Sequence, residues 1–207
     1  MKGGSLFPAV KFLPHQFYHL YNRGVNKGQI FLEAENYRFF LRRLSEYLDK
    51  ACAQIIAYCL MPNHYHAVIR LANSLDFSNT LRGFTSSYVK SFNAWHHRFG
   101  YLFQGNTQSR LIEGDDDLVQ LCRYVHLNPV TAGFVPLPEL WEYSDYRDWI
   151  AEPTVENSSI RSLREIYFGS GEQYRLFVMD YAAEAKMRKQ IELKLFGSTK
   201  QKSVFSL

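Results

Sequence analysis

The order in which two hydrophobic periodicities follow one another along the chain most restricts its fold. Residues 15–21 and 64–71 alternate apolar with polar side chains, and residues 54–60 form a short apolar run, so each segment predicts a β-strand. Residues 109–113 are a shorter strand candidate. The turn sequence Met61-Pro62-Asn63 separates the second and third segments, which predicts that they form a hairpin.

Helical patterns occupy the two long gaps between these strands. Asn36 is a predicted N-cap for a helix that runs to about Lys50. A longer helical pattern opens at Asn73 or Ser74 and continues to about Phe99. The element order is therefore β-α-β-β-α-β. It predicts an α+β fold of the ferredoxin-like (RRM-like) class, with a four-stranded antiparallel sheet and these helices on one face.

An added third helix is predicted to begin at Asp115, where three consecutive carboxylates suit the positive end of a helix dipole. Its buried stripe is expected to consist of Leu118, Leu121, Cys122 and Val125. Tyr124 and Asn128 lie four residues apart, so they should be neighbours on one border of that stripe. Pro129 predicts that the helix ends or kinks at Asn128.

After Gly133 the sequence changes character. An irregular, proline-punctuated segment is expected to wrap back onto the core through four aromatic residues, Trp141, Tyr143, Tyr146 and Trp149. Two further helices are predicted near residues 159–168 and 171–196, and Ser170 and Gln173 stand at capping-box spacing for the second. The chain is thus expected to divide into a domain of residues 1–133 and a wrapping segment with a helical C-terminal extension, residues 134–207.

Composition restricts the function and location of the chain less than its sequence patterns restrict the fold. The 24 Lys and Arg exceed the 20 Asp and Glu by four, which suits a polyanionic partner but equally an ordinary soluble surface. Cys52, Cys59 and Cys122 lie in apolar stretches without C-x-x-C spacing, so we expect reduced core thiols. Because no window approaches the roughly 18 apolar residues of a membrane span, we expect a cytoplasmic protein without a membrane partner.

His64 and His66 carry the first chemical signal. Alternate side chains of a strand share a face, so both imidazoles should point the same way, while Tyr65 points to the opposite face. Two neutral imidazoles at this spacing can chelate one divalent cation. The pattern is weak when it is taken alone, because two histidines at this spacing also occur by chance.

A second motif makes the pattern specific. Met61-Pro62-Asn63-His64-Tyr65-His66, followed by Arg123-Tyr124-Val125-His126-Leu127-Asn128-Pro129-Val130, resembles the single-tyrosine transposases of the HUH endonuclease superfamily. The resemblance is closest to their REP-associated tyrosine transposase branch, with supporting matches at residues 21–24, 30–31 and 100–104. It extends from about His15 to Gly133, so residues 1–133 are expected to form the catalytic domain.

The resemblance implies a site and a reaction. It implies that His64, His66 and Asn128 are the metal ligands, with Mg²⁺ or Mn²⁺ as cofactor, and that Tyr124 is the nucleophile. The implied activity is cleavage and rejoining of single-stranded DNA through a 5′-phosphotyrosine, and the implied substrate is hairpin DNA, often a repeated extragenic palindrome. Minimal relatives are dimers and branches with added C-terminal material act as monomers, so a monomer or a homodimer is expected.

Further residues are candidates for contacts with DNA. Six basic residues are predicted phosphate contacts: Arg23, Arg82, Lys90, Arg98, Arg110 and Arg123. Tyr65, Tyr101 and Phe103 are candidates for stacking on unpaired bases. The loop before the fourth strand departs from the family pattern, since Asn106-Thr107-Gln108 replaces basic residues. The basic residues between Lys186 and Lys202 form either a solvated surface or a phosphate-contacting arm.

Two other functions remain open at this point. The same fold serves as a catalytically inactive module that binds single-stranded nucleic acid. A metal-dependent hydrolase is the other alternative, in which His64, His66 and a carboxylate such as Asp115 activate water. Tyr88 is the second-ranked nucleophile. His126 lies about 200° around its helix from Tyr124, so we expect a structural or surface role for it.

Overall fold

The computed structural model describes residues 12–73, 76–151 and 158–182. Its central layer is an antiparallel sheet in the order β2-β3-β1-β4. The four strands are β1 (Gln16–Arg23), β2 (Ala53–Met61), β3 (His64–Leu71) and β4 (Gln108–Leu111). The ferredoxin-like prediction is therefore confirmed, and the hairpin between β2 and β3 turns at Pro62 and Asn63 as expected.

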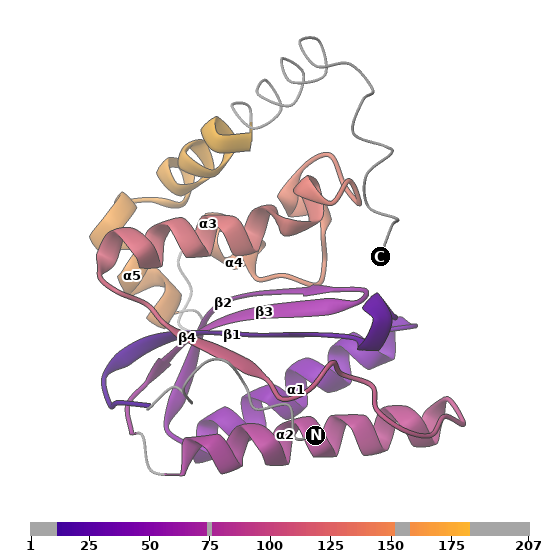
Figure 1. Cartoon of the computed structure of the whole chain (residues 1–207). Coiled ribbons are helices and arrows are strands. Elements are labelled where there is room, and N and C mark those ends of the chain that lie inside the picture. The colour runs from indigo at the N-terminus through magenta and orange to yellow at the C-terminus, as the bar shows by residue number, and fades with distance from the viewer. Residues whose placement is uncertain (1–11, 74–75, 152–157, 183–207) are drawn as a thin grey trace, which may run out of the picture.

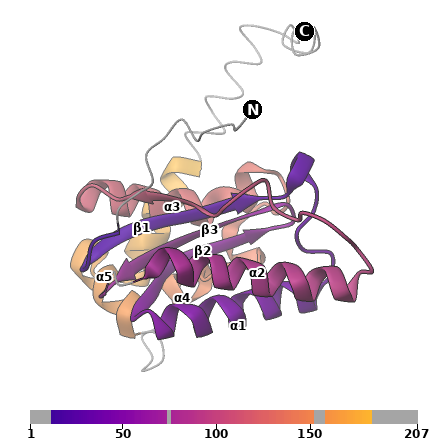
Figure 2. The ribbon, with the colours of Figure 1, turned by 60° about the horizontal axis from the view of Figure 1, so that its bottom comes forward.

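Helices cover both faces of this sheet (Figures 1 and 2). One face carries α1 (Ala34–Lys50) and α2 (Phe77–Trp95). The other carries α3 (Asp115–Thr131), α4 (Tyr146–Ile150) and α5 (Ser158–Phe168). Two short 3₁₀ segments, η1 (Val25–Lys27) and η2 (Pro138–Leu140), lie in loops, and residues 171–182 are helical. Among the described residues, no helix is both long and apolar enough to span a membrane.

Successive side chains of each strand point to opposite faces of the sheet, where they enter two separate cores. Tyr18 and Leu20 of β1 join Tyr65 of β3 in the core beneath α1 and α2. The intervening residues His19 and Tyr21 therefore point toward α3. The second core lies between the sheet and α3, and the predicted stripe of α3 is buried in it: Leu118, Leu121, Cys122 and Val125 are each at most 7% exposed.

The segment after Gly133 wraps back onto the core, as predicted, and it does so along β2. β2 is an edge strand, and its outer backbone groups bond to this segment: Leu60 N–H donates to the Tyr143 carbonyl at 2.8 Å. The indole N–H groups of Trp141 and Trp149 donate to the carbonyls of Leu60 and Ile56, both at 3.1 Å. The segment therefore closes one edge of the sheet. Whether residue 133 is a true domain boundary stays a prediction.

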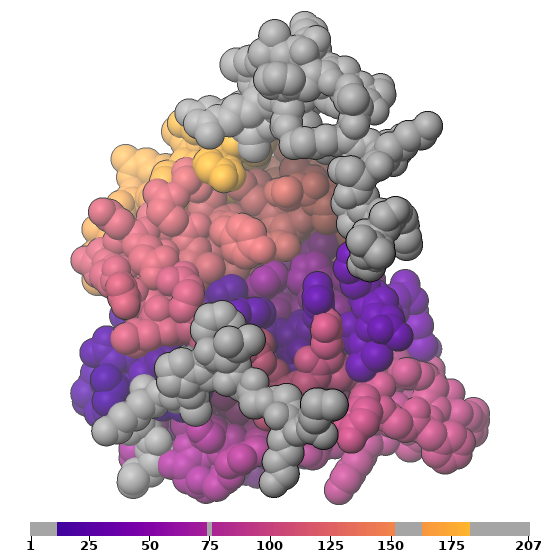
Figure 3. All heavy atoms as spheres, in the orientation of Figure 1, coloured from indigo at the N-terminus to yellow at the C-terminus, as the bar shows by residue number. Residues whose placement is uncertain are grey.

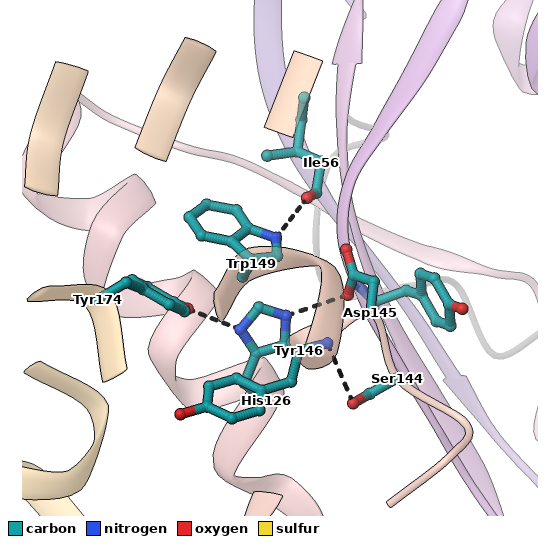
Figure 4. A network of polar contacts seen from close by, with 8 residues as sticks. Ile56, His126, Ser144, Asp145, Tyr146, Trp149 and Tyr174 are labelled. Carbon is teal, nitrogen blue, oxygen red and sulfur yellow. Dashed lines mark hydrogen bonds and ion pairs between the residues drawn. The ribbon is translucent and has the colours of Figure 1, made fainter. Parts of the chain in front are cut away.

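A buried polar cluster fixes α3 to this segment (Figure 4). His126 is fully buried, with Nε2 3.0 Å from an Asp145 carboxylate oxygen and Nδ1 2.6 Å from the Tyr174 hydroxyl. The same Asp145 oxygen accepts the Tyr58 N–H of β2 at 2.7 Å. His126 is thus a structural residue and not a surface one. It ties together α3, the edge of β2 and the helix of residues 171–182.

Three predictions about local structure are wrong. Asn36 is the third residue of α1, and Glu33 is its N-cap; the Asn36 amide oxygen instead accepts the Glu33 N–H, which completes a capping box. Pro129 does not end α3, because proline removes only one backbone donor and the Ala132 N–H resumes the ladder to the Asn128 carbonyl at 2.9 Å. Cys52 is exposed, unlike Cys59 and Cys122.

The true stop signal of α3 is Gly133. Its φ of +78° is left-handed, a conformation that costs glycine little. The Phe134 N–H donates to the Pro129 carbonyl at 2.9 Å and the Gly133 N–H donates to the Val130 carbonyl at 3.0 Å. This is the pair of bonds that defines a Schellman motif.

The predicted helix at 171–196 is confirmed over residues 171–182. The Ser170 hydroxyl accepts the Gln173 N–H at 3.2 Å. The rest of the predicted helix lies outside the described residues, as do the basic residues from Lys186 to Lys202.

Candidate active site

A cleft of about 580 Å³ opens between β1, β3 and α3. Figure 3 shows this face of the molecule, on which a hollow separates the surface of α3 from that of β1 and η1. Polar and aromatic residues from five secondary-structure elements and two connecting loops line the cleft. They are Tyr21, Asn22, Arg23, Lys27, Asn63, His64, Tyr65, His66, Gln104, Gln108 and Tyr124.

His64 and His66 reach this cleft from β3. Their ring centroids are 5.2 Å apart, and His66 pairs across the sheet with Tyr21 of β1 and Cys59 of β2. Because β3 has a neighbour on each side, its backbone cannot shift easily, and both imidazoles are held on one rigid surface. Tyr65 points to the opposite face, as predicted, and is 1% exposed in the other core.

The helix α3 brings Tyr124 and Asn128 to the same place. The Tyr124 ring meets the His66 ring edge to face at 5.4 Å, and the Tyr124 side chain is 52% exposed. The Asn128 amide oxygen lies 3.3 Å from Nε2 of His64, while the Asn128 amide nitrogen donates to the Tyr124 carbonyl at 3.1 Å. The four residues singled out in the sequence therefore converge from β3 and α3.

Two further residues contact the Nδ1 atoms of these imidazoles, and neither contact was predicted. The Asn63 amide oxygen lies 2.7 Å from Nδ1 of His64, and His19 Nε2 lies 2.9 Å from Nδ1 of His66. His19 is only 7% exposed and stacks on His66 with centroids 5.0 Å apart. The alternation of β1 could have revealed His19, because it places His19 on the face opposite to Tyr18 and Leu20.

Burial keeps the imidazoles uncharged at neutral pH. Burial, assisted by the neighbouring His19 and His64, lowers the pKa of His66 to about 3. Burial, assisted by the charge of Arg110, lowers the pKa of His19 to about 4. Burial also lowers the pKa of His64, against the opposing effect of its hydrogen bond with Asn128. Uncharged imidazoles have a free lone pair, which is the state required of a metal ligand.

The arrangement of donors and acceptors fits a divalent cation. If Nδ1–H of His64 donates to Asn63, then Nε2 of this neutral ring has a lone pair, and it faces the Asn128 amide oxygen, a second acceptor, at 3.3 Å. A cation between two such acceptors would satisfy both. Among the described residues, no three His, Cys, Asp or Glu side chains cluster as a metal site, so the third protein ligand here would be an amide.

The six predicted phosphate contacts are distributed around the molecule. Only Arg23 lines the cleft, where its Nε donates to the Gln104 amide oxygen at 2.5 Å. Lys27, which was not predicted, lines the cleft beside it. Arg110 forms a two-bond ion pair with Asp117 at 2.6 and 2.9 Å.

The remaining four basic candidates lie elsewhere. Arg82 and Lys90 are exposed on α2, which covers the other face of the sheet, and Arg98 follows α2 and lies over the Phe92 ring. The guanidinium of Arg123 lies 4.2 Å from each of two aromatic ring centroids in the helix of residues 171–182. The cations nearest to the cleft are therefore Arg23 and Lys27.

Burial argues against the second-ranked nucleophile and two of the stacking candidates. Tyr88 is completely buried and donates its hydroxyl to the Ile30 carbonyl at 2.6 Å, so it cannot reach DNA. Tyr65 and Phe103 are at most 5% exposed, whereas Tyr101 is 88% exposed. The stacking predictions for Tyr65 and Phe103 are wrong, because both rings are buried in the core beneath α1 and α2.

The geometry also argues against Asp115 as a ligand. Asp115 begins α3 and stands thirteen residues before Asn128. At a helical rise of about 1.5 Å per residue, the two lie roughly 20 Å apart. A hydrolase that combines Asp115 with His64 and His66 is therefore incompatible with this fold.

Comparison with known proteins identifies the family and supports the fold. Residues 14–128 match the family model described as IS200-like transposase. A candidate REP-associated tyrosine transposase from Haemophilus influenzae is 28% identical over 110 residues, which are 48% of this chain and 62% of that protein. The chain thus covers less than two thirds of that relative. A solved REP-associated tyrosine transposase bound to a REP hairpin matches with a TM-score of 0.59 and 19% identity, over 72% of this chain and 87% of that one, which supports the fold.

Proposed function

The chain belongs to the IS200-like transposase family, and we propose that it is a metal-dependent endonuclease and strand transferase for single-stranded DNA that contains hairpins. The observation that carries this proposal is the convergence of Tyr124 and Asn128 from α3 on His64 and His66 from β3. The hairpin substrate is proposed from the similar structure, which is a complex with a REP hairpin. Three of these residues line the cleft and Asn128 contacts His64, and a nucleophile beside a candidate metal site supports catalysis over binding alone.

Tyr124 is the proposed nucleophile. Its hydroxyl attacks a phosphorus of the DNA backbone, the bond from that phosphorus to the 3′ oxygen breaks, and a 5′-phosphotyrosine and a free 3′-OH result. A 3′-OH of another strand reverses the step and releases Tyr124. One phosphate ester replaces another in each step, so cleavage and joining need no external energy source.

His64, His66 and Asn128 are the proposed ligands of Mg²⁺ or Mn²⁺. A divalent cation bound there would stabilise the negative charge that builds up on the transferring phosphate. Asn63 and His19 orient the two imidazoles through their Nδ1 atoms. Arg23 and Lys27 at the rim are suited to hold the neighbouring phosphates, because both are cations that line the same cleft.

The test is the formation of a covalent adduct. Full-length protein is incubated with a labelled single-stranded oligonucleotide that contains a hairpin, with Mn²⁺ or Mg²⁺, and separated on a denaturing gel. We expect a metal-dependent adduct whose modified peptide contains Tyr124, and we expect none with Tyr124→Phe. Tyr21 is the matched control, because it is the other exposed tyrosine that lines the cleft.

Three results would contradict the proposal. Binding without an adduct, over a range of hairpins and metal concentrations, would indicate an inactive DNA-binding module. Cleavage that persists in Tyr124→Phe would indicate attack by water or by another residue. Loss of the adduct in Tyr21→Phe alone would assign the nucleophile to Tyr21.

A further inference from the structure

The loop between α2 and β4 exposes two aromatic side chains. Phe99 is 95% exposed and Tyr101 is 88% exposed, the highest values among the large hydrophobic residues of the described chain. Burial of an aromatic side chain removes about 150–250 Å² of surface from water, so leaving two of them in solvent forgoes a substantial stabilisation. Two such side chains in one loop make the loop a candidate for contact with a partner.

The loop that carries them is held in place at several points. The Asn93 amide nitrogen donates to the Gly100 carbonyl at 3.0 Å, and the Val25 N–H donates to the Leu102 carbonyl at 3.0 Å. Leu102 and Phe103, which follow Tyr101 directly, are at most 5% exposed. Tyr101 therefore projects from a backbone that its buried neighbours anchor to the core.

The same loop forms part of the cleft wall. The Gln104 N–H donates to the Arg23 carbonyl at 2.9 Å, and both side chains line the cleft. Tyr101 precedes Gln104 by three residues, so their Cα atoms are at most about 11 Å apart. Figures 1 and 2 both show this loop at the end of the sheet where η1 lies. The loop that exposes the two rings therefore also contributes Gln104 to the cleft that Arg23 and Lys27 line.

We propose that Phe99 and Tyr101 form a stacking platform for unpaired bases of the DNA strand whose backbone occupies the cleft. The inference rests on the proposed function and adds a base-binding surface to it. Aromatic rings beside cations are the combination that binds single strands, because every base has a face that can stack and every nucleotide has a phosphate. A protein partner fits less well, since the same loop contributes Gln104 to the cleft that Arg23 and Lys27 line, and these cations suit a polyanion.

The test measures binding to oligonucleotides with unpaired flanks of increasing length. Full-length wild type, Phe99→Ala, Tyr101→Ala and the double variant are titrated into labelled hairpins whose flanks have none, four or twelve unpaired nucleotides, with EDTA present. Anisotropy gives Kd, and 2-aminopurine in the flank reports stacking through its fluorescence. Ile166→Ala is the control, because Ile166 is 71% exposed on α5, away from the loop.

We expect each alanine variant to raise Kd about tenfold for the long flank only, and to lose quenching of 2-aminopurine. Tyr101→Phe should bind like wild type, because it keeps the ring. An unchanged Kd, or an equal loss for hairpins without a flank, would overturn the platform. If the variants lose affinity as expected but wild type forms no adduct, only the proposed function fails.

Discussion

The hydrogen bond between His19 and His66 decides which nitrogen of His66 is available to the cleft. Each uncharged imidazole has one N–H, so one of the two rings donates and the other accepts across the 2.9 Å contact. When Nδ1–H of His66 donates, its Nε2 keeps a lone pair for a cation. When His19 donates, the proton of His66 lies on Nε2 and blocks coordination.

His19 should therefore influence metal affinity without touching the metal. We expect His19→Leu, which removes the acceptor, to weaken Mn²⁺ binding about 10- to 100-fold in calorimetric titration. His19→Gln can still accept from Nδ1–H and should lose less. The thermal midpoint without metal serves as the control for folding. Equal Mn²⁺ affinity in His19→Leu and wild type would contradict this role.

The buried imidazoles also predict how stability depends on pH. In the unfolded chain each histidine takes up a proton near pH 6.5, whereas in the folded chain His66 and His19 resist protonation until about pH 3 and 4. Their contribution to stability is therefore complete above pH 6.5 and decreases as the pH falls below that value. Between pH 7 and pH 5 we expect a loss of about 2 kcal/mol or more in the free energy of unfolding.

Urea unfolding in EDTA at the two pH values measures this loss. His19→Leu removes one of the two titrating groups, so its stability should depend less on pH than that of wild type. A wild-type free energy of unfolding that stays constant from pH 7 to pH 5 would contradict the buried, uncharged state of the pair.

At the scale of elements, hydrophobic periodicity predicted those features of the fold that depend on which side chains are buried. The bounds of β3 and the buried stripe of α3 follow from side chains that must face a core, so the sequence displays them directly. The meeting of Tyr124 with His66 and of Asn128 with His64 required the motif resemblance, because no local sequence pattern determines how a helix is placed on a sheet. The end of α1 at Lys50 and the start of α3 at Asp115 were predicted correctly. The other ends of these two helices were not, since Asn36 and Pro129 each have a second compatible position near a terminus.

The orientation of α3 depends on contacts distant in sequence. His126 lies between Tyr124 and Asn128, and its ring is held by Asp145 and Tyr174. We expect Tyr174→Phe to lower the free energy of unfolding by about 1–3 kcal/mol, because it leaves Nδ1 of the buried imidazole without its partner. Urea unfolding measures the loss. Tyr181→Phe is the matched control, since Tyr181 is a 46% exposed tyrosine of the same helix, and an equal effect of both changes would contradict a specific role for the buried cluster.

At the scale of the whole molecule, the two faces of the sheet are completed by different parts of the chain. The core beneath α1 and α2 is built mainly from residues before 104, whereas the core beneath α3 also takes Trp149, Tyr174 and Val178 from beyond Gly133. The segment after Gly133 also covers the outer edge of β2 through backbone and indole hydrogen bonds. The active-site helix therefore rests on a core that the first 133 residues do not complete.

A chain cut after Gly133 should consequently fold poorly, although it contains every proposed catalytic residue. It would expose the apolar face of α3 and the free edge of β2, and an unprotected edge strand pairs readily with other chains. We expect residues 1–133 to aggregate on purification, or to show a non-cooperative urea transition and fast amide exchange in α3, whereas the full chain unfolds cooperatively. A soluble 1–133 fragment with the full-length transition midpoint would show that the extension is not needed to hold Tyr124 in the cleft.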